Sequence, residues 1–294
     1  MFFESMGKKL FASVLSATRP MDNMPLHFDL PQEDELATVL LLGPQTYSPY
    51  FSISFMKDER QYRPYQAMRE TEVPPQERNA WMAAFRYLLT KLKCRDILQQ
   101  RRSGKHRSKQ LLLKSPCHTA RPEMLLQLFP KAKFVYIHRN PFEVFLSGAH
   151  MASTTYGYMF LQRPTDAELQ EYILKQGEVL VGEYQRCKDI GLLTNENLVE
   201  ISFEDLTKDP YNKLSEVYRK FGWASASFPS NLEEISKHTD ENHVKFLEKL
   251  KEHCLKLKSY QRNKFADKRL DKKLKETIRS RWSRHFDFGY SKDW

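Results

Sequence analysis

The chain has 294 residues, of which 40% are hydrophobic and 29% are charged. This composition excludes a disordered chain and a small disulfide-stapled fold, and the length allows one large hydrophobic core. The net charge is +10, and residues 245–294 hold sixteen Lys and Arg against seven Asp and Glu. We therefore expect an anionic partner, which charge alone does not name.

Neither a membrane-spanning helix nor a secretory leader is predicted. No apolar run of about eighteen residues occurs, and the first residues, MFFESMGKK, place their charges after the apolar residues. The four cysteines are widely spaced, without a C-x-x-C pair, and no spacing of His or Cys indicates a metal site. We expect a cytoplasmic protein without a metal ion, unless residues upstream of the chain add a membrane anchor.

The first half of the chain predicts several helices and one short strand. A helix is predicted over 77–93, where apolar residues recur at helical spacing and form a core-facing stripe. The stripe consists of Trp81, Phe85, Leu88, Leu89 and Leu92. The apolar run 111–113, which ends at Lys114, predicts a short buried strand. Further helices are predicted over 8–16, 36–42 and 120–129.

The second half alternates predicted strands with helices. Strands are predicted over 133–138 and 198–202, where β-branched and aromatic residues cluster. The predicted helices are 141–153, 165–187, 209–222 and much of 230–285, and the second of these opens with the capping box Thr165-x-x-Glu168. This alternation is typical of parallel βαβ units. We therefore predict a single α/β domain over 1–294, with a short parallel sheet flanked by helices.

Polar residues follow two of the predicted strands. The first group is 114–118 (KSPCH), and the second is 138–141 (HRNP), with Ser147 on the following helix. Ligands of open parallel sheets gather beyond the carboxyl ends of the strands. A guanidinium, a hydroxyl and the free N–H groups of a helix start can converge there on a phosphate. Arg139 and Ser147 are therefore the predicted anion ligands.

These segments resemble the sulfotransferases that use 3′-phosphoadenosine-5′-phosphosulfate (PAPS). The matching motifs lie in order along the chain: 112–119 (LLKSPCHT), 125–135 (LLQLFPKAKFV), 139–147 (RNPFEVFLS), 203–210 (FEDLTKDP) and 286–290 (FDFGY). Upstream, 19–24 (RPMDNM) and 31–35 (PQEDE) are similar to bacterial-type members of this family. The resemblance implies a P-loop-NTPase-like sulfotransferase fold. It also implies transfer of a sulfuryl group from PAPS to a hydroxyl or amine of a small-molecule or carbohydrate acceptor.

The resemblance also implies roles for individual residues. Arg139 and Ser147 would bind the 3′-phosphate of the nucleotide, and His118 would take the proton from the acceptor. Lys114 would neutralise charge that grows on the sulfuryl oxygens. Lys114 and His118 are four apart, whereas the cytosolic branch of the family places this pair two apart. The segment 260–264 (YQRNK) resembles one that closes over the nucleotide, which adds the nucleotide contacts Arg262 and Lys264.

Structural roles stay open beside these functional ones. Arg139 could serve as an ion-pair donor, His118 as a helix-start histidine bonded to backbone, Lys114 as a solvated flank and Ser147 as an ordinary helix hydroxyl. Aromatic residues between 47 and 65 could line an acceptor pocket or belong to the core.

One family motif is missing from the sequence. The family holds the 5′-phosphosulfate with a P-x-S-G-T-T loop, which should precede 19–24, and no such segment occurs. We therefore expect the first βα unit to be missing and the chain as given to transfer sulfate slowly or not at all. The main alternative is a non-catalytic remnant that binds adenosine 3′,5′-bisphosphate or a protein partner. A nucleic-acid binder, indicated by the basic residues of 245–294, and a nucleotide kinase are further alternatives. The apolar residues of 245–294 recur at helical spacing, which favours the solvated face of a packed helix over a nucleic-acid binder. The missing phosphate loop disfavours a nucleotide kinase.

Overall fold

The computed structural model describes residues 18–19, 21–25, 30, 32–43, 48–102, 104, 110–223, 241–257, 263 and 270–291. The chain divides into two compact units that alternate along the sequence. The first unit consists of Met1–Leu26, Lys131–Gly148 and Ile190–Trp294, and the second of His27–Pro130 and Ala149–Asp189. That all 294 residues act as one domain stays a prediction.

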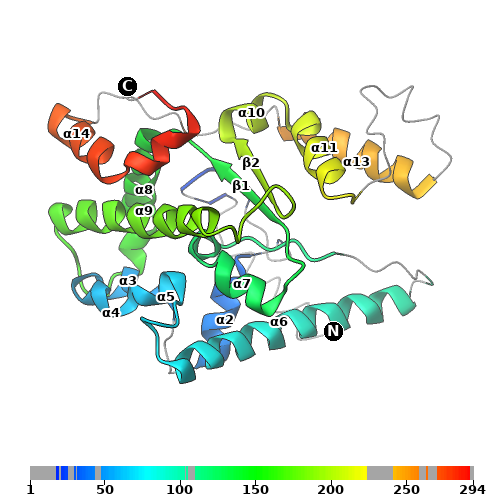
Figure 1. The fold of residues 1–294 in the computed structure, drawn as a ribbon, viewed down its shortest axis with the longest axis horizontal. Coiled ribbons are helices and arrows are strands. Elements are labelled where there is room, and N and C mark those ends of the chain that lie inside the picture. The colour runs from blue at the N-terminus through cyan, green and yellow to red at the C-terminus, as the bar shows by residue number, and fades with distance from the viewer. Residues whose placement is uncertain are drawn as a thin grey trace. The chain divides into compact units, whose positions relative to one another are not determined.

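A two-stranded parallel sheet forms the centre of the first unit (Figure 1). Strand β1 (Phe134–His138) pairs with β2 (Leu198–Ser202), with Phe134 opposite Leu198 and His138 opposite Ser202. No third strand joins them within the described part of the chain. Two of the three predicted strands are therefore confirmed, and so is the α/β class with a short parallel sheet.

Helices of the first unit pack against this sheet and against each other. They are α8 (Pro141–Thr154), of which the first half belongs to this unit, α10 (Phe203–Lys208), α11 (Pro210–Lys220), α13 (Glu241–Leu257) and α14 (Lys272–Arg281). Val199 and Ile201 of β2 form a buried cluster with Val217 and Phe221 of α11. The helical expectation for 230–285 is confirmed where α13 and α14 lie.

Aromatic contacts join the C-terminal segment of the first unit to β1 and to the start of α8. Phe286, in the 3-10 helix η5 (Ser283–Phe288), packs edge-on against Phe142 with ring centroids 5.5 Å apart. His138 stacks on Phe288 at 4.3 Å.

Burial lowers the pKa of His285 to about 4, so this imidazole is neutral at pH 7.

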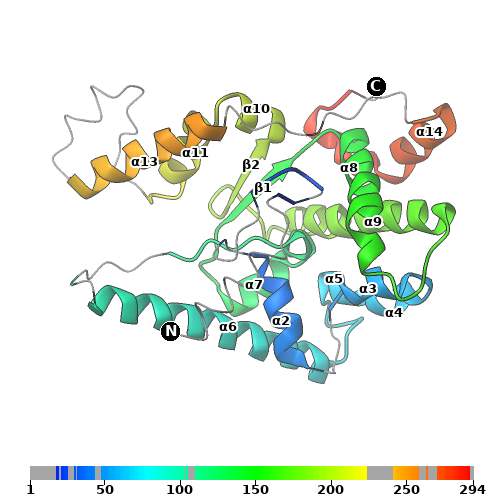
Figure 2. The ribbon, with the colours of Figure 1, turned by 180° about the vertical axis from the view of Figure 1, so that it is seen from behind.

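The second unit is helical in its described residues, and its longest element is α6 (Pro75–Arg102) (Figure 2). Its other helices are α2 (Asp34–Leu42), α3 (Phe51–Ser54), α4 (Glu59–Tyr62), α5 (Pro64–Ala67), α7 (Pro122–Leu128) and α9 (Asp166–Asp189), with the 3-10 helices η1 (Met56–Asp58), η2 (Pro116–Ala120) and η3 (Tyr156–Tyr158). Trp81 and Phe85 of α6 are fully buried, as predicted, while Leu88 is half-buried. The helix extends past 93 to Arg102 because most residues of 94–102, which are Arg, Leu and Gln, are good helix formers.

The start of α9 contains the predicted capping box. The Thr165 backbone N–H donates to the Glu168 carboxylate at 2.7 Å, and the Glu168 N–H donates to the Thr165 hydroxyl at 3.3 Å. Two N–H groups without partners inside the helix are thereby satisfied. The capping box therefore predicts the start of α9 correctly from the sequence.

The predicted strand over 111–113 is wrong. This segment has no regular secondary structure, and Leu112 is 88% exposed. A strand needs a neighbouring strand for its backbone hydrogen bonds, and none pairs with these leucines in the described part of the chain. Lys114 therefore lies in a loop that leads into η2, and not at a sheet edge. The predicted helix over 8–16 lies outside the described residues.

Candidate functional site

Three consecutive acidic residues, Glu33, Asp34 and Glu35, form the centre of the candidate site in the second unit. They stand at the start of α2, where the helix dipole favours negative charge. Each pairs with a different basic residue from the segment that follows the loop at 111–113. The three pairs are Glu33–Lys114, Asp34–His118 and Glu35–Arg121. These six residues are called the triplet site below.

The middle pair holds His118 by one ring nitrogen. His118 Nε2 lies 2.8 Å from Asp34 Oδ2, and the other oxygen of Asp34 accepts a hydrogen bond from the Ser115 hydroxyl. Burial opposes ionisation of Asp34. The hydrogen bond and charge of His118, together with the Ser115 hydroxyl, outweigh it and leave the pKa of the carboxyl below its ordinary value of 3.8. The ionised form therefore stabilises the fold above about pH 4, and this contribution is lost as the pH falls through the lowered pKa.

The other ring nitrogen of His118 is left with a free lone pair. A carboxylate only accepts hydrogen bonds, so Nε2 carries the proton and Nδ1 is the basic nitrogen of the neutral ring. Nδ1 is buried and has no hydrogen-bond partner among the described residues. The Phe85 ring lies edge-on to the imidazole, with centroids 5.7 Å apart. An imidazole held by a carboxylate on one nitrogen and free on the other can accept a proton, once a reactant reaches it.

The Glu35–Arg121 pair is the structural support of the triplet site. Both side chains are fully buried, and Arg121 Nη1 lies 2.6 Å from Glu35 Oε2. Arg121 also donates to the backbone carbonyls of Tyr65 and Gln66 at 2.6 and 3.0 Å, and its guanidinium lies 4.5 Å from the centre of the Trp81 ring. Although burial disfavours its charge, the Glu35 carboxylate raises the pKa of Arg121 above its ordinary value. Arg121 therefore keeps its charge in the core beside Glu35.

The Glu33–Lys114 pair lies at the solvent-facing side. The Lys114 side chain is 74% exposed and its ammonium contacts the Glu33 carboxylate, which also accepts a hydrogen bond from the Tyr50 hydroxyl. Burial, aided by Glu33, raises the pKa of the Tyr50 phenol, which therefore remains a donor. An ammonium has three N–H donors. Lys114 can keep Glu33 and still contact an anion.

Arg139 and Ser147 lie in the first unit, after β1. The Asn140 side chain accepts from the Phe142 N–H at 3.0 Å and so caps the start of α8. Arg139 lies over the Phe203 ring at 4.7 Å and donates through Nε to Glu143 at 2.7 Å. Glu143 and Ser147 are four apart on α8 and therefore share a face. The guanidinium thus contacts the α8 face that carries Ser147.

The remaining predicted site residues, Arg262 and Lys264, lie outside the described residues. Asn263 between them is described, and its side chain donates to the Met21 carbonyl at 2.8 Å. This contact joins Asn263 to Met21 inside the first unit. No group of three His, Cys, Asp or Glu side chains suited to a metal ion occurs where the structure describes the chain. A search of the same residues finds no helix that is long and apolar enough to cross a membrane.

The sequence indicated His118 and Lys114 but missed their partners. The segment 31–35 was recognised only as a family motif, without a role for its three acidic residues. The signal that could have found them is charge matching: three consecutive acids at a helix start, and basic residues at 114, 118 and 121. The common cleft for Lys114, His118 and Arg139 stays a prediction, since these residues belong to different units.

Comparisons with known proteins match the chain to a family model and to named relatives. A family model described as "Sulfotransferase family" matches residues 38–227. The chain is 31% identical over 210 residues to omega-hydroxy-beta-dihydromenaquinone-9 sulfotransferase Stf3 of Mycobacterium bovis, and equally to the protein of that name from Mycobacterium tuberculosis. Each match covers 71% of this chain and 49% of the relative, so the chain spans about half the length of these relatives. No solved structure gives a significant match. The family match, over more than half of the chain, shows that this protein belongs to the sulfotransferase family.

Proposed function

We propose that the protein transfers the sulfuryl group of PAPS to a hydroxyl or amine of a small-molecule or carbohydrate acceptor, with His118 as the general base. The observation that carries this proposal is the Asp34–His118 pair, which leaves Nδ1 as a free basic nitrogen. Both mycobacterial relatives are named for an omega-hydroxy acceptor, which favours a hydroxyl over an amine. The activity and its substrates are proposed for a full-length protein that also supplies the family's 5′-phosphosulfate loop, whereas the 294 residues alone are expected to transfer sulfate slowly or not at all.

In this mechanism the acceptor oxygen attacks the sulfur as its proton passes to His118 Nδ1. The bond between the sulfur and the bridging phosphate oxygen breaks, and adenosine 3′,5′-bisphosphate leaves. Asp34 stabilises the imidazolium that forms, because its carboxylate already accepts a hydrogen bond from Nε2–H. Lys114 donates to the sulfuryl oxygens as charge grows on them. Since Nδ1 is closed to solvent, neighbouring side chains must move before the acceptor reaches it.

In the first unit, Arg139 and Ser147 would bind the 3′-phosphate of the donor. The Arg139 guanidinium donates to the Glu143 carboxylate in this structure. A phosphate would compete with this carboxylate for the same N–H donors. Removing the charge of Glu143 therefore tests the role of Arg139. If Arg139 binds the phosphate, its affinity for the phosphate should rise; if Arg139 only supports the fold, this affinity should not rise. Arg262 and Lys264 are proposed as additional nucleotide contacts.

We expect adenosine 3′,5′-bisphosphate to bind more tightly than 5′-AMP, and Arg139→Ala to remove most of this preference. The loss of one charge-assisted contact weakens binding by roughly ten- to hundredfold. Glu143→Gln should instead tighten binding of the bisphosphate while leaving 5′-AMP unchanged. Isothermal titration calorimetry on the three proteins measures all of these affinities.

Lys213→Ala is the matched control, because Lys213 pairs with Glu216 on α11 in the same unit and has no proposed ligand. Equal affinity of the unmodified protein for the two nucleotides would exclude a 3′-phosphate site. Weaker bisphosphate binding by Glu143→Gln would indicate that the Arg139–Glu143 pair only supports the fold.

A further inference from the structure

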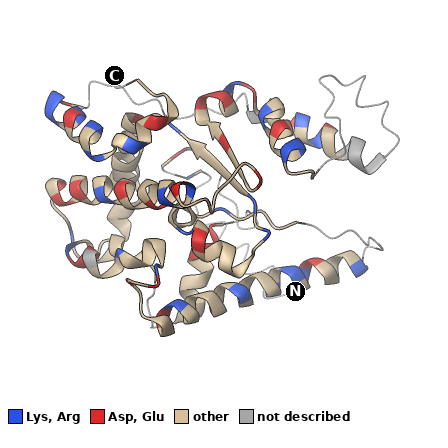
Figure 3. Cartoon of the chain, viewed as in Figure 1, with Lys and Arg blue, Asp and Glu red and all other residues tan. Residues whose placement is uncertain are grey.

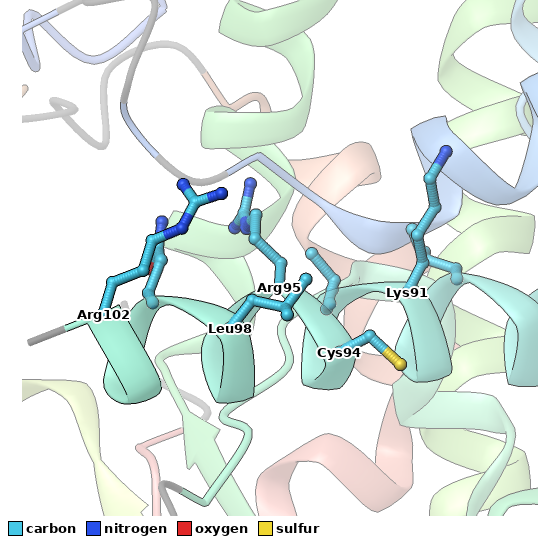
Figure 4. A pocket seen from close by; sticks show the side chains of 8 residues that line it. Lys91, Cys94, Arg95, Leu98 and Arg102 are labelled. Atoms are coloured by element: carbon cyan, nitrogen blue, oxygen red, sulfur yellow. The ribbon is translucent and has the colours of Figure 1, made fainter. Parts of the chain in front are cut away.

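The last turns of α6 carry a surface that the triplet site does not use. In Figures 1 and 2 this part of the helix extends past α2 and α7 of the same unit. A groove of about 570 Å³ runs along it, and every described residue that lines this groove comes from α6. Figure 4 shows Lys91, Arg95 and Arg102 pointing to one side of the helix, with Leu98 between the two arginines. The α6 surface is defined here as Lys91, Leu92, Arg95, Leu98 and Arg102.

The spacing of these residues places the three cations and Leu98 on one face. Lys91, Arg95, Leu98 and Arg102 follow each other at intervals of four, three and four, which is the repeat of an α-helix face. The three cations are exposed, and so is Leu98, with 54% of its surface accessible. Arg95 and Arg102 pair with no carboxylate among the described residues. The described residues around them therefore give no structural role for these two arginines or for the exposed Leu98.

The sequence from 91 to 109 carries many more positive than negative charges. Residues 91–109 contain eight Lys and Arg, at 91, 93, 95, 101, 102, 105, 107 and 109, and one acidic residue, Asp96. Asp96 accepts a hydrogen bond from Gln100 at 2.6 Å. Figure 3 shows the basic residues that recur along the described part of the helix. A partner for this surface must therefore be anionic.

The apolar residues decide which kind of anion fits. Tyr87, 56% exposed, lies on the same face about three turns before Leu98, with its ring beside the Lys91 ammonium. A nucleic acid would pair its phosphates with the cations, but among the described residues of this face it could stack bases only on Tyr87, and it would leave Leu98 in water. Basic residues near an anionic membrane bind its headgroups, and an exposed aliphatic side chain beside them can enter the acyl boundary. Charge complementarity and exposed leucine together favour a lipid surface.

We propose that the α6 surface docks the protein onto an anionic lipid bilayer. Lys91, Arg95 and Arg102 contact lipid phosphates, while Leu98 enters the boundary between headgroups and acyl chains. The positive charge at this end of α6 thereby gains a role that sulfuryl transfer does not require. The proposal stands independently of the donor and acceptor proposed above.

Vesicle sedimentation tests this docking. The full-length protein is mixed with vesicles of phosphatidylcholine alone, or of phosphatidylcholine and phosphatidylglycerol in a ratio of two to one. We expect binding to the mixed vesicles that weakens with added salt, and little binding to phosphatidylcholine. The variant K91Q/R95Q/R102Q should bind the mixed vesicles roughly a hundredfold more weakly, because each basic residue near an anionic surface contributes about a fivefold factor. Leu98→Ser should weaken binding even at low salt.

The control variant, K249Q/K272Q/K273Q, removes three exposed lysines from α13 and α14 of the other unit. It should bind as the unmodified protein does, and thermal melts should show all variants folded. The proposal is overturned if the K91Q/R95Q/R102Q variant keeps its vesicle affinity, or if the control loses as much. It is equally overturned if K91Q/R95Q/R102Q loses binding to a single-stranded oligonucleotide but not to vesicles.

Discussion

His118→Ala is expected to lower kcat for sulfuryl transfer by about a hundred- to ten-thousandfold, the usual contribution of a general base. The KM for the donor should change little, because the imidazole acts on the acceptor. The measurement is steady-state transfer of radiolabelled sulfate, with His253→Ala as control, since His253 is exposed on α13. Unchanged turnover of His118→Ala would show that another group accepts the proton.

Asp34→Asn tests the positioning role of Asp34 beside the same base. The amide has nearly the shape of the carboxylate but carries no charge, and its NH2 group can donate to Nε2 and leave the proton on Nδ1. We expect kcat to fall about a hundredfold or more, because the ring then presents an N–H where a base is needed. The KM for the donor should change little, because Asp34 acts through His118. A loss of stability with an unchanged kcat would indicate a structural role alone.

The second large effect is expected on stability. Arg121→Met leaves the Glu35 carboxylate fully buried without its partner, and breaking such a pair destabilises a fold by about 3–5 kcal/mol. Urea unfolding measures the change. The double variant Arg121→Met, Glu35→Leu should recover much of the lost free energy of unfolding, because no unpaired charge then stays in the core. A change below about 1 kcal/mol in the single variant would contradict the buried ion pair.

The sequence predicted the local features of this fold and missed the long-range ones. Apolar spacing located α6 through Trp81 and Phe85, and four residues of capping chemistry located the start of α9. The strand over 111–113 was wrong because three leucines do not reveal whether a partner strand exists. The predicted end of α6 at 93 was too early, because strong helix formers continue the helix beyond its apolar stripe to Arg102.

The same division holds for the candidate site. His118 and Lys114 could be proposed because they stand in one short motif that resembles a family pattern. Their partners lie some eighty residues upstream, and no periodicity connects an acidic helix start with a distant loop. The structure added these contacts, and with them the reason why Nδ1, and not Nε2, is the basic nitrogen.

Transfer from radiolabelled PAPS is the measurement that tests the central claim most directly. The full-length protein is incubated with the donor and a panel of acceptors that includes phenols, sugars and omega-hydroxy quinones. The account predicts label in an acceptor, one adenosine 3′,5′-bisphosphate released per label transferred, and loss of both in His118→Ala. Tight binding of the bisphosphate, with no label transferred to any acceptor, would contradict it and would identify a protein that keeps the nucleotide site without the chemistry.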